Sequence, residues 1–113
     1  MSTATTGRRT EHAVRDDLSQ AGWVVAARAA GSKGAADLVC FKRGWVLLVQ
    51  CKRSNAQLPP AERQALIHLA DVLGLHIALP VVATKPVRQP ITYRLLTGTG
   101  ARDWVAWTPR EES

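Results

Sequence analysis

Three polar side chains stand at the ends of two apolar stretches in DLVCFKRGWVLLVQCK, residues 37–52. Asp37 opens the first stretch, and Gln50 and Lys52 close the second. Carboxylate and amide oxygens are hard ligands that suit Mg²⁺, and Mn²⁺ can take its place. A bound Mg²⁺ can polarise a phosphoryl oxygen, and a lysine beside it can steady the charge that builds on phosphorus. The residue types therefore favour phosphodiester hydrolysis, although a salt bridge at a sheet edge would explain the spacing equally well.

Whether these side chains meet depends on how the two stretches pair. Side chains alternate across a strand, so Gln50 and Lys52 share one face. A two-residue hairpin loop at Arg43-Gly44 sets Asp37 opposite Gln50, at the open end of the hairpin and on that same face. A slip of one residue would turn Asp37 to the other face. This register predicts that Cys40 and Cys51 lie on the opposite face, too far apart for a disulfide, as small core residues.

The rest of the chain predicts one α/β domain. We expect a flexible lead over residues 1–7 and a single domain over residues 8–113. Helices are predicted over residues 8–22 and 60–74, each ending at a glycine. Strands are predicted over residues 23–30, 36–41, 45–51, 77–84, 91–96 and 103–107. This order of elements is typical of a mixed sheet with helices packed on it.

Glu11 is a carboxylate on the apolar face of the first predicted helix, in step with Val14 and Leu18. An inward carboxylate is unfavourable unless it has a partner. Two interpretations stay open. Glu11 could lie in the first helical turn, where the helix dipole favours an acid, or it could belong to a site.

Composition indicates which classes of molecule the chain is expected to bind. The chain has 113 residues, a formal net charge of +6 and a pI near 10.2. A basic excess suggests a polyanionic partner, nucleic acid before an anionic membrane, although a merely soluble basic protein is the alternative. No stretch is long and apolar enough for a membrane span or signal core, so we expect a cytoplasmic protein with reduced cysteines.

Other residue types indicate no further cofactor. There is no glycine-rich phosphate loop, so no nucleotide cofactor is expected. His12, His68 and His76 are scattered without metal-ligand spacing, and we interpret them as structural. Trp104 and Trp107 could pack in the core or at an interface, and core packing is the better interpretation for at least one of them.

Four segments, in order, resemble the PD-(D/E)xK nuclease superfamily, and more narrowly the archaeal-type Holliday-junction resolvases that also occur in phages. They are GRRTEHAVRDDLSQAGW, RAAGSKGAADLV, VLLVQCK and LPVVATK, within roughly residues 7–85. The resemblance implies a restriction-endonuclease-like fold, a mixed central β-sheet flanked by helices. It also implies a Mg²⁺-dependent, homodimeric endonuclease that resolves four-way DNA junctions in a prokaryotic or phage-infected cell.

Carried over by position, the resemblance assigns roles to residues of this chain. Asp37 matches the principal metal ligand, Glu11 the helix acid that completes the metal site, and Lys52 the catalytic lysine. Ser32 matches a loop serine near the scissile phosphate. Gln50 stands where the family usually has Glu; its oxygen can still bind Mg²⁺, but it brings no charge. The matching DNA-binding positions are Arg8, Arg9, Arg28 and Lys33. Arg53 is a further candidate for DNA contact, although it could equally be a solvated surface charge.

Further basic residues and other functions remain open. Lys42, Arg43 and Arg63 could also face DNA, although each could equally be a solvated surface charge. The alternative functions are a nuclease for other branched or end structures, a DNA-binding protein whose nuclease site has decayed, and a small basic protein that pairs with another protein.

Overall fold

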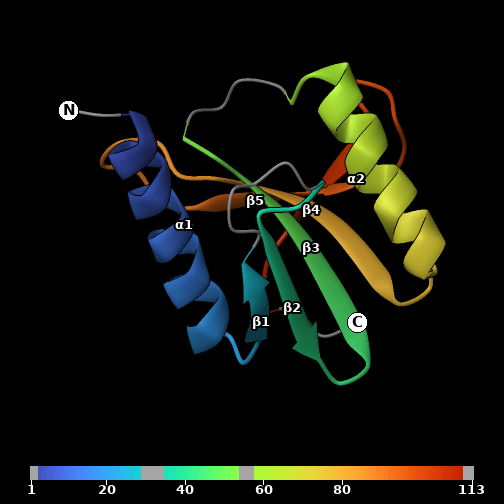
Figure 1. Ribbon diagram of the computed structural model, residues 1–113, viewed down its shortest axis with the longest axis horizontal. Coiled ribbons are helices and arrows are strands. Elements are labelled where there is room, and N and C mark those ends of the chain that lie inside the picture. The colour runs from blue at the N-terminus through green and yellow to red at the C-terminus, as the bar shows by residue number, and fades with distance from the viewer. Residues whose placement is uncertain (1–2, 29–34, 54–57, 111–113) are drawn as a thin grey trace.

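The computed structural model describes residues 3–28, 35–53 and 58–110, without the side chains of residues 3–8 and 27–28. Within these ranges the chain forms a mixed α/β fold with one six-stranded sheet, as predicted (Figure 1). The elements are α1 (Thr3–Gln20), β1 (Val24–Arg28), β2 (Leu38–Lys42), β3 (Trp45–Lys52), α2 (Pro60–Leu73), β4 (Ala78–Thr84), β5 (Thr92–Leu96) and β6 (Trp104–Trp107).

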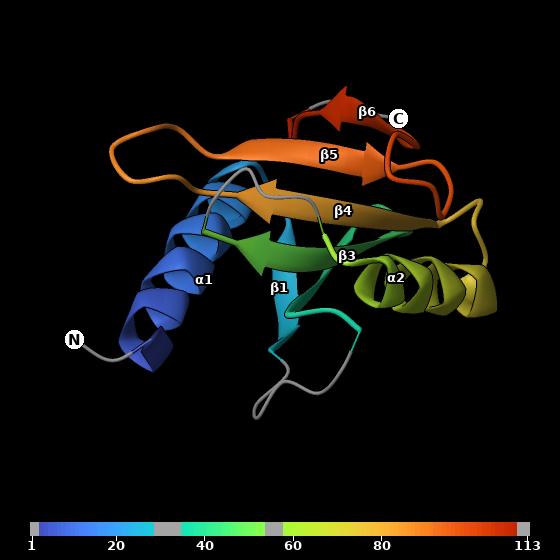
Figure 2. The same ribbon diagram turned by 90° about the horizontal axis from the view of Figure 1, so that it is seen from above.

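The strands lie in the sheet in their sequence order. β1, β2 and β3 form an antiparallel meander, and β4, β5 and β6 form another. The two meanders join through the parallel pair β3–β4, and α2 is the crossover between these strands. Figure 2 shows β3 to β6 side by side, with the sheet ending at β6. The end of β3 therefore lies near the middle of the sheet.

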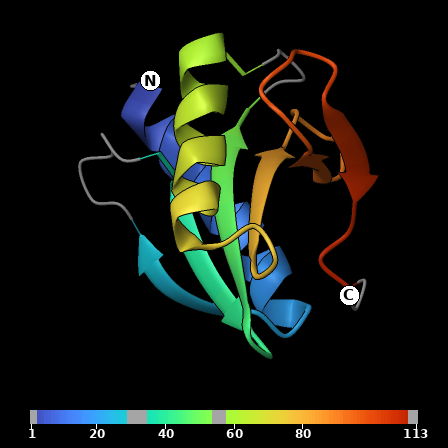
Figure 3. The same cartoon turned by 90° about the vertical axis from the view of Figure 1, so that its right-hand side faces the viewer.

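A helix covers each face of the sheet. Val14 and Leu18 of α1 pack with Leu47 and Val49 in one core cluster. On the other face, Leu66 and Ala70 of α2 pack with Leu48 and Val82. Figure 3 shows α2 in front of the sheet and α1 behind it. Because β3 is buried on both faces, its sequence is almost continuously apolar rather than alternating.

Helix α1 begins earlier than predicted. It starts at Thr3 rather than at residue 8, so residues 3–7 are helical. No proline interrupts this segment, and the hydrogen bonds of a helix are local, so the helix can include it. Its end is as predicted: Gly22 adopts φ 95°, and the Trp23 amide donates to the carbonyl oxygen of Leu18 at 3.0 Å.

The β2–β3 hairpin has the predicted loop and register. Arg43 and Gly44 both adopt positive φ, 50° and 87°, as a two-residue type I′ turn requires. Phe41 pairs with Val46, and Leu38 pairs with Val49. The next position along each strand sets Asp37 opposite Gln50, so the register on which the candidate site depends is confirmed.

The C-terminal strands add an aromatic cluster to the face that α1 covers. The ring of Trp107 is buried against Trp23 and Tyr93, with centroid separations of 6.1 and 5.7 Å. Trp104, on the opposite face of β6, is 40% exposed, with the guanidinium of Arg94 4.7 Å from its ring centroid. The prediction that at least one of the two tryptophans packs in the core is therefore confirmed. Among the described helices, none has the length and apolar character needed to cross a membrane.

Candidate active site

Two hydrogen bonds hold Asp37 against the last residues of β3. Its amide donates to the carbonyl oxygen of Val49 at 2.7 Å, and its Oδ2 accepts from the amide of Cys51 at 2.8 Å. These bonds lie on either side of Gln50, so the half-buried carboxylate is fixed at the end of β3. A side chain fixed by backbone groups is preorganised for binding or catalysis, because it loses little conformational freedom when a ligand arrives.

Gln50 is buried, with 7% of its surface exposed. Its Nε2 donates to the carbonyl oxygen of Ala35 at 3.2 Å. The amide therefore ties β3 to the segment that leads into Asp37. A carboxylate at this position would accept only and could not make that bond.

Lys52 extends towards α2. Its Nζ lies 3.1 Å from Oε1 of Glu62, in the first turn of α2, and the two side chains are 32% and 38% exposed. Glu62 was not among the predicted site residues. Its signal was a carboxylate two residues after Pro60 at a helix start, in the connection that follows the strand carrying Lys52.

Glu11 and Glu62 both affect the pKa of Asp37. Burial raises the pKa of Asp37 above its usual value, and the hydrogen bond from the Cys51 amide partly offsets this. The negative charges of Glu11 and Glu62 raise that pKa further, and the positive charge of Lys52 lowers it. One acid from each helix thus lies close enough to act on Asp37.

Glu11 is half-buried on α1 and lines a small crevice with His12, Arg15 and Leu38. Because α1 starts at Thr3, Glu11 lies about two turns into the helix. The helix dipole acts mainly within the first turn, so it does not explain an acid at this position. The alternative that Glu11 belongs to a site is therefore favoured.

No three His, Cys, Asp or Glu side chains in the described ranges are grouped closely enough to hold a metal ion by themselves. This is compatible with magnesium, which keeps several waters and needs only one or two protein carboxylates beside the phosphates of a substrate. The predicted donors Glu11, Asp37 and Gln50 supply hard oxygens of that kind. On donor chemistry they fit a hard divalent cation.

The other predicted site residues are Ser32 and the DNA-binding residues, and the structure describes only some of them. Arg9 and Arg53 are exposed, on α1 and directly after Lys52. Ser32 and Lys33, and the side chains of Arg8 and Arg28, lie outside the described residues.

Two further basic residues bind backbone carbonyl oxygens. Nζ of Lys42 donates to the carbonyl oxygen of Ala21 at 2.8 Å and lies over the ring of Trp23. Arg63 is buried, and its guanidinium donates to the carbonyl oxygens of Leu58 and Thr99. Arg63 is therefore not a solvated surface charge, and the DNA contact suggested for either residue stays a prediction. Arg43 is exposed in the hairpin turn.

The two cysteines are free thiols on the α1 side of the sheet, as predicted. Burial raises the pKa of Cys40 to about 12 and raises that of Cys51 as well, with Asp37 and Glu11 adding to the effect at Cys51. Both remain thiols at neutral pH. Neither is suited to act as a nucleophile.

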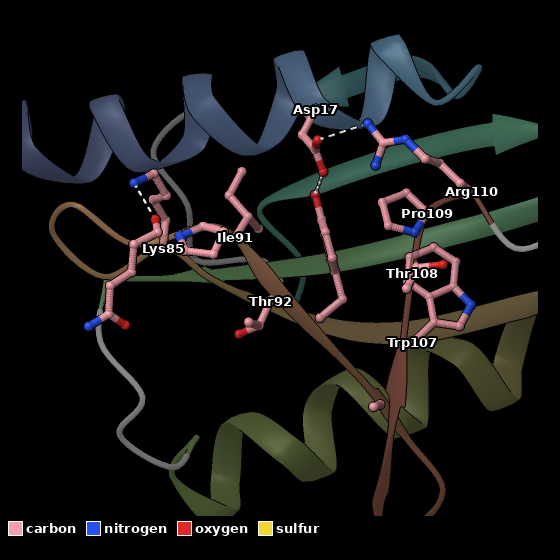
Figure 4. Close-up of a pocket in the computed structure, with 12 residues that line it drawn as sticks. Asp17, Lys85, Ile91, Thr92, Trp107, Thr108, Pro109 and Arg110 are labelled. Carbon is pink, nitrogen blue, oxygen red and sulfur yellow. Dashed lines mark hydrogen bonds and ion pairs between the residues drawn. The ribbon is translucent and has the colours of Figure 1, made fainter.

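A larger groove of about 670 Å³ lies away from these residues, beside α1. Figure 4 shows Asp17 of α1 beside Arg110, whose guanidinium donates to Asp17 at 3.3 Å. The hydroxyl of Tyr93 donates to the same carboxylate at 2.7 Å. None of Glu11, Asp37, Gln50 or Lys52 lines this groove. Its polar groups bind one another and hold the C-terminal segment to α1, which is a structural role.

The fold is similar to that of a solved nuclease. No model of a protein family matches the sequence, and no curated protein matches it. The structure resembles that of Hjc, a Holliday junction resolvase from the archaeal hyperthermophile Archaeoglobus fulgidus, with a TM-score of 0.66 and 25% sequence identity. The similarity covers 78% of this chain and 70% of that chain.

The chain has the fold of an archaeal-type Holliday junction resolvase. This agrees with the resemblance seen in the sequence and confirms the restriction-endonuclease-like fold class. The likeness supports a resolvase-like nuclease. It covers most of the chain rather than a single motif.

Proposed function

We propose that this protein is a Mg²⁺-dependent, structure-selective endonuclease that resolves four-way DNA junctions. The observation that carries the proposal is the carboxylate of Asp37, held by backbone at the end of β3 on a resolvase-like fold. Gln50 lies opposite Asp37 in the hairpin, and Lys52 follows Gln50 by two residues. The Val49 carbonyl and the Cys51 amide that hold Asp37 belong to the strand that also carries Gln50 and Lys52. The chemistry suggested by residue type is therefore supported by position.

Glu11, Asp37 and Gln50 are the residues that would hold the cation. A divalent cation there would polarise a phosphoryl oxygen and lower the pKa of a bound water. The clustering of acids around Asp37 is unfavourable without a cation, since neighbouring negative charges raise its pKa.

Lys52 is the residue best placed to act on the phosphate. Its ion pair with Glu62 is partly exposed, and such pairs contribute about 0–1 kcal/mol, so a phosphate oxygen can compete for the ammonium group. In that position Lys52 would stabilise the negative charge that develops on phosphorus and orient the attacking water. Asp37, fixed by two backbone bonds, would set the direction of attack.

The partner that fits is branched DNA, bound by two copies of this chain. A four-way junction presents two equivalent strands, and a two-fold homodimer would place one site on each. The net charge of +6 favours contact with phosphates, with Arg9 and Arg53 as the described basic residues nearest in sequence to the site. Sedimentation equilibrium should give twice the chain mass of 12.3 kDa.

The substrate is tested by comparing cleavage of a four-way junction with a mobile core, a flap and a linear duplex, each with and without Mg²⁺. We expect paired, symmetric nicks in the junction alone, and only with the metal. Preferred cleavage of the flap or duplex would assign another substrate. Junction binding without cleavage, in Mn²⁺ as well as Mg²⁺, would indicate a decayed nuclease.

The assignment of the site is tested by Asp37→Ala. Removal of this carboxylate should abolish cleavage while junction binding persists, because binding rests on basic residues elsewhere. Full cleavage by Asp37→Ala would refute the assignment.

A further inference from the structure

Position 50 lacks the negative charge that a carboxylate would bring to the end of β3, and a carboxylate from another element lies nearby. We propose that Glu62 of α2 supplies that charge, as a positioning residue that holds Lys52 and balances its ammonium beside the cation. This inference rests on the proposed function. It assigns Glu62 no direct contact with the metal.

The ion pair between Lys52 and Glu62 is the geometric basis of the proposal. Oε1 of Glu62 lies 3.1 Å from Nζ of Lys52, so the pair orients the lysine head group. Without Glu62, the ammonium would stand unbalanced beside a cation site and repel the incoming ion. With it, three carboxylates and one ammonium leave a net double negative charge, which matches a divalent cation.

Glu62 is held in place by its neighbour in the helix. Arg63 is buried, and its guanidinium donates to the carbonyl oxygens of Leu58 and Thr99. These bonds join the first turn of α2 to the segment before the helix and to the connection between β5 and β6. Glu62 therefore projects from a fixed turn, and its influence on the pKa of Asp37 agrees with this position.

The same contacts would also be compatible with a purely structural role of Glu62. An acid in the first turn of a helix is favoured by the helix dipole, and a surface ion pair adds little. In that case Glu62 would affect the stability of α2 but not the affinity for a cation. The two roles thus predict different results for ion binding.

The test measures Mn²⁺ affinity by calorimetry, without DNA and at constant ionic strength. Glu62→Gln should weaken Mn²⁺ binding about tenfold, as expected for one charge near a divalent ion in a partly screened site. Asp71→Asn, an exposed acid on the same helix, makes the same change in net charge and should alter affinity by less than about twofold. Glu62→Asp keeps the charge and should retain most of the affinity.

A second-site variant distinguishes local charge from helix stability. Gln50→Glu places a carboxylate on β3 and removes the bond from Gln50 to Ala35, so the double variant Gln50→Glu with Glu62→Gln should bind Mn²⁺ more tightly than Glu62→Gln alone. Thermal unfolding by circular dichroism checks that each variant is folded at the temperature of the titration.

The outcomes separate the two proposals. If Asp37→Ala loses Mn²⁺ binding while Glu62→Gln binds as tightly as Asp71→Asn, the role of Glu62 is refuted and the proposed function stands. If the parent protein has no Mn²⁺ site that Asp37→Ala removes, the proposed function fails and this inference fails with it.

Discussion

Gln50 has a role in this structure that a glutamate could not fill. Its Nε2 donates to the carbonyl oxygen of Ala35 and so holds the segment before Asp37. A carboxylate there would face that oxygen without a proton to donate. Gln50→Glu therefore has two opposed effects: it adds charge near the cation and removes a tether of Asp37.

Asp37 is an acid whose ionised form is unfavourable in the fold. Its pKa is raised above 3.8, chiefly by burial, so stability from this group is full below pH 3.8 and is lost as pH rises through the raised folded-state pKa. Asp37→Asn keeps an oxygen for the Cys51 amide and removes the charge. We expect a higher melting temperature than the parent protein at pH 7 in chelator, and no gain below pH 3.8. A lower melting temperature at pH 7 would contradict this account of Asp37.

Lys52 should act on the chemical step rather than on binding. Lys52→Ala should lower the single-turnover cleavage rate about 10²–10³-fold, because a preorganised donor to the developing charge is lost. Lys85 directly follows the neighbouring strand β4, but its Nζ donates to the carbonyl oxygens of Pro86 and Gln89. Lys85→Ala is therefore the matched control, with a rate within about threefold of the parent protein. Equal losses in the two variants would argue against a special role for Lys52.

At the scale of elements, the β2–β3 hairpin aligns the site. Gly44 adopts φ 87°, and an added Cβ would meet nothing within 4 Å. Gly44→Ala should therefore cost about 1–2 kcal/mol from backbone conformation alone. Gly44→Asn should cost less, since Asn tolerates positive φ. Urea unfolding measures both, and equal stability of Gly44→Ala and the parent protein would contradict the turn assignment.

Local patterns predicted the elements and the hairpin register, because both depend on residues close in sequence. The Arg43-Gly44 turn fixed which residues pair, and the glycines at 22 and 74 marked the helix ends. The start of α1 was missed because residues 3–7 carry no apolar stripe to mark a helix. A helix can extend past its packed face without such a signal.

Contacts between elements were harder to predict. Glu62 contacts Lys52 because the first turn of α2, at the start of the crossover from β3 to β4, lies next to the end of β3. Arg63 was treated as a surface cation, although its spacing from Leu66 and Ala70 already put it on the buried stripe of α2. The fold alone supplies the carbonyl oxygens that make a buried arginine tolerable.

At the scale of the whole molecule, the excess of positive charge should dominate DNA affinity. The logarithm of the junction binding constant should fall linearly with the logarithm of salt concentration, because phosphate contacts release counterions. Arg53→Ala should reduce the magnitude of that slope by about 1 if Arg53 contacts a phosphate. Lys42→Ala should leave the slope unchanged, since its ammonium is bound to Ala21. Equal slopes for Arg53→Ala and the parent protein would remove Arg53 from the interface.

The central claim is that Glu11, Asp37 and Gln50 gather around one divalent cation at the end of β3, with Lys52 beside it. The most direct measurement is anomalous diffraction from a crystal soaked in Mn²⁺. The account predicts an anomalous peak within coordination distance of the Asp37 carboxylate. A fully occupied lattice with no peak there, and with these side chains turned away from one another, would contradict it.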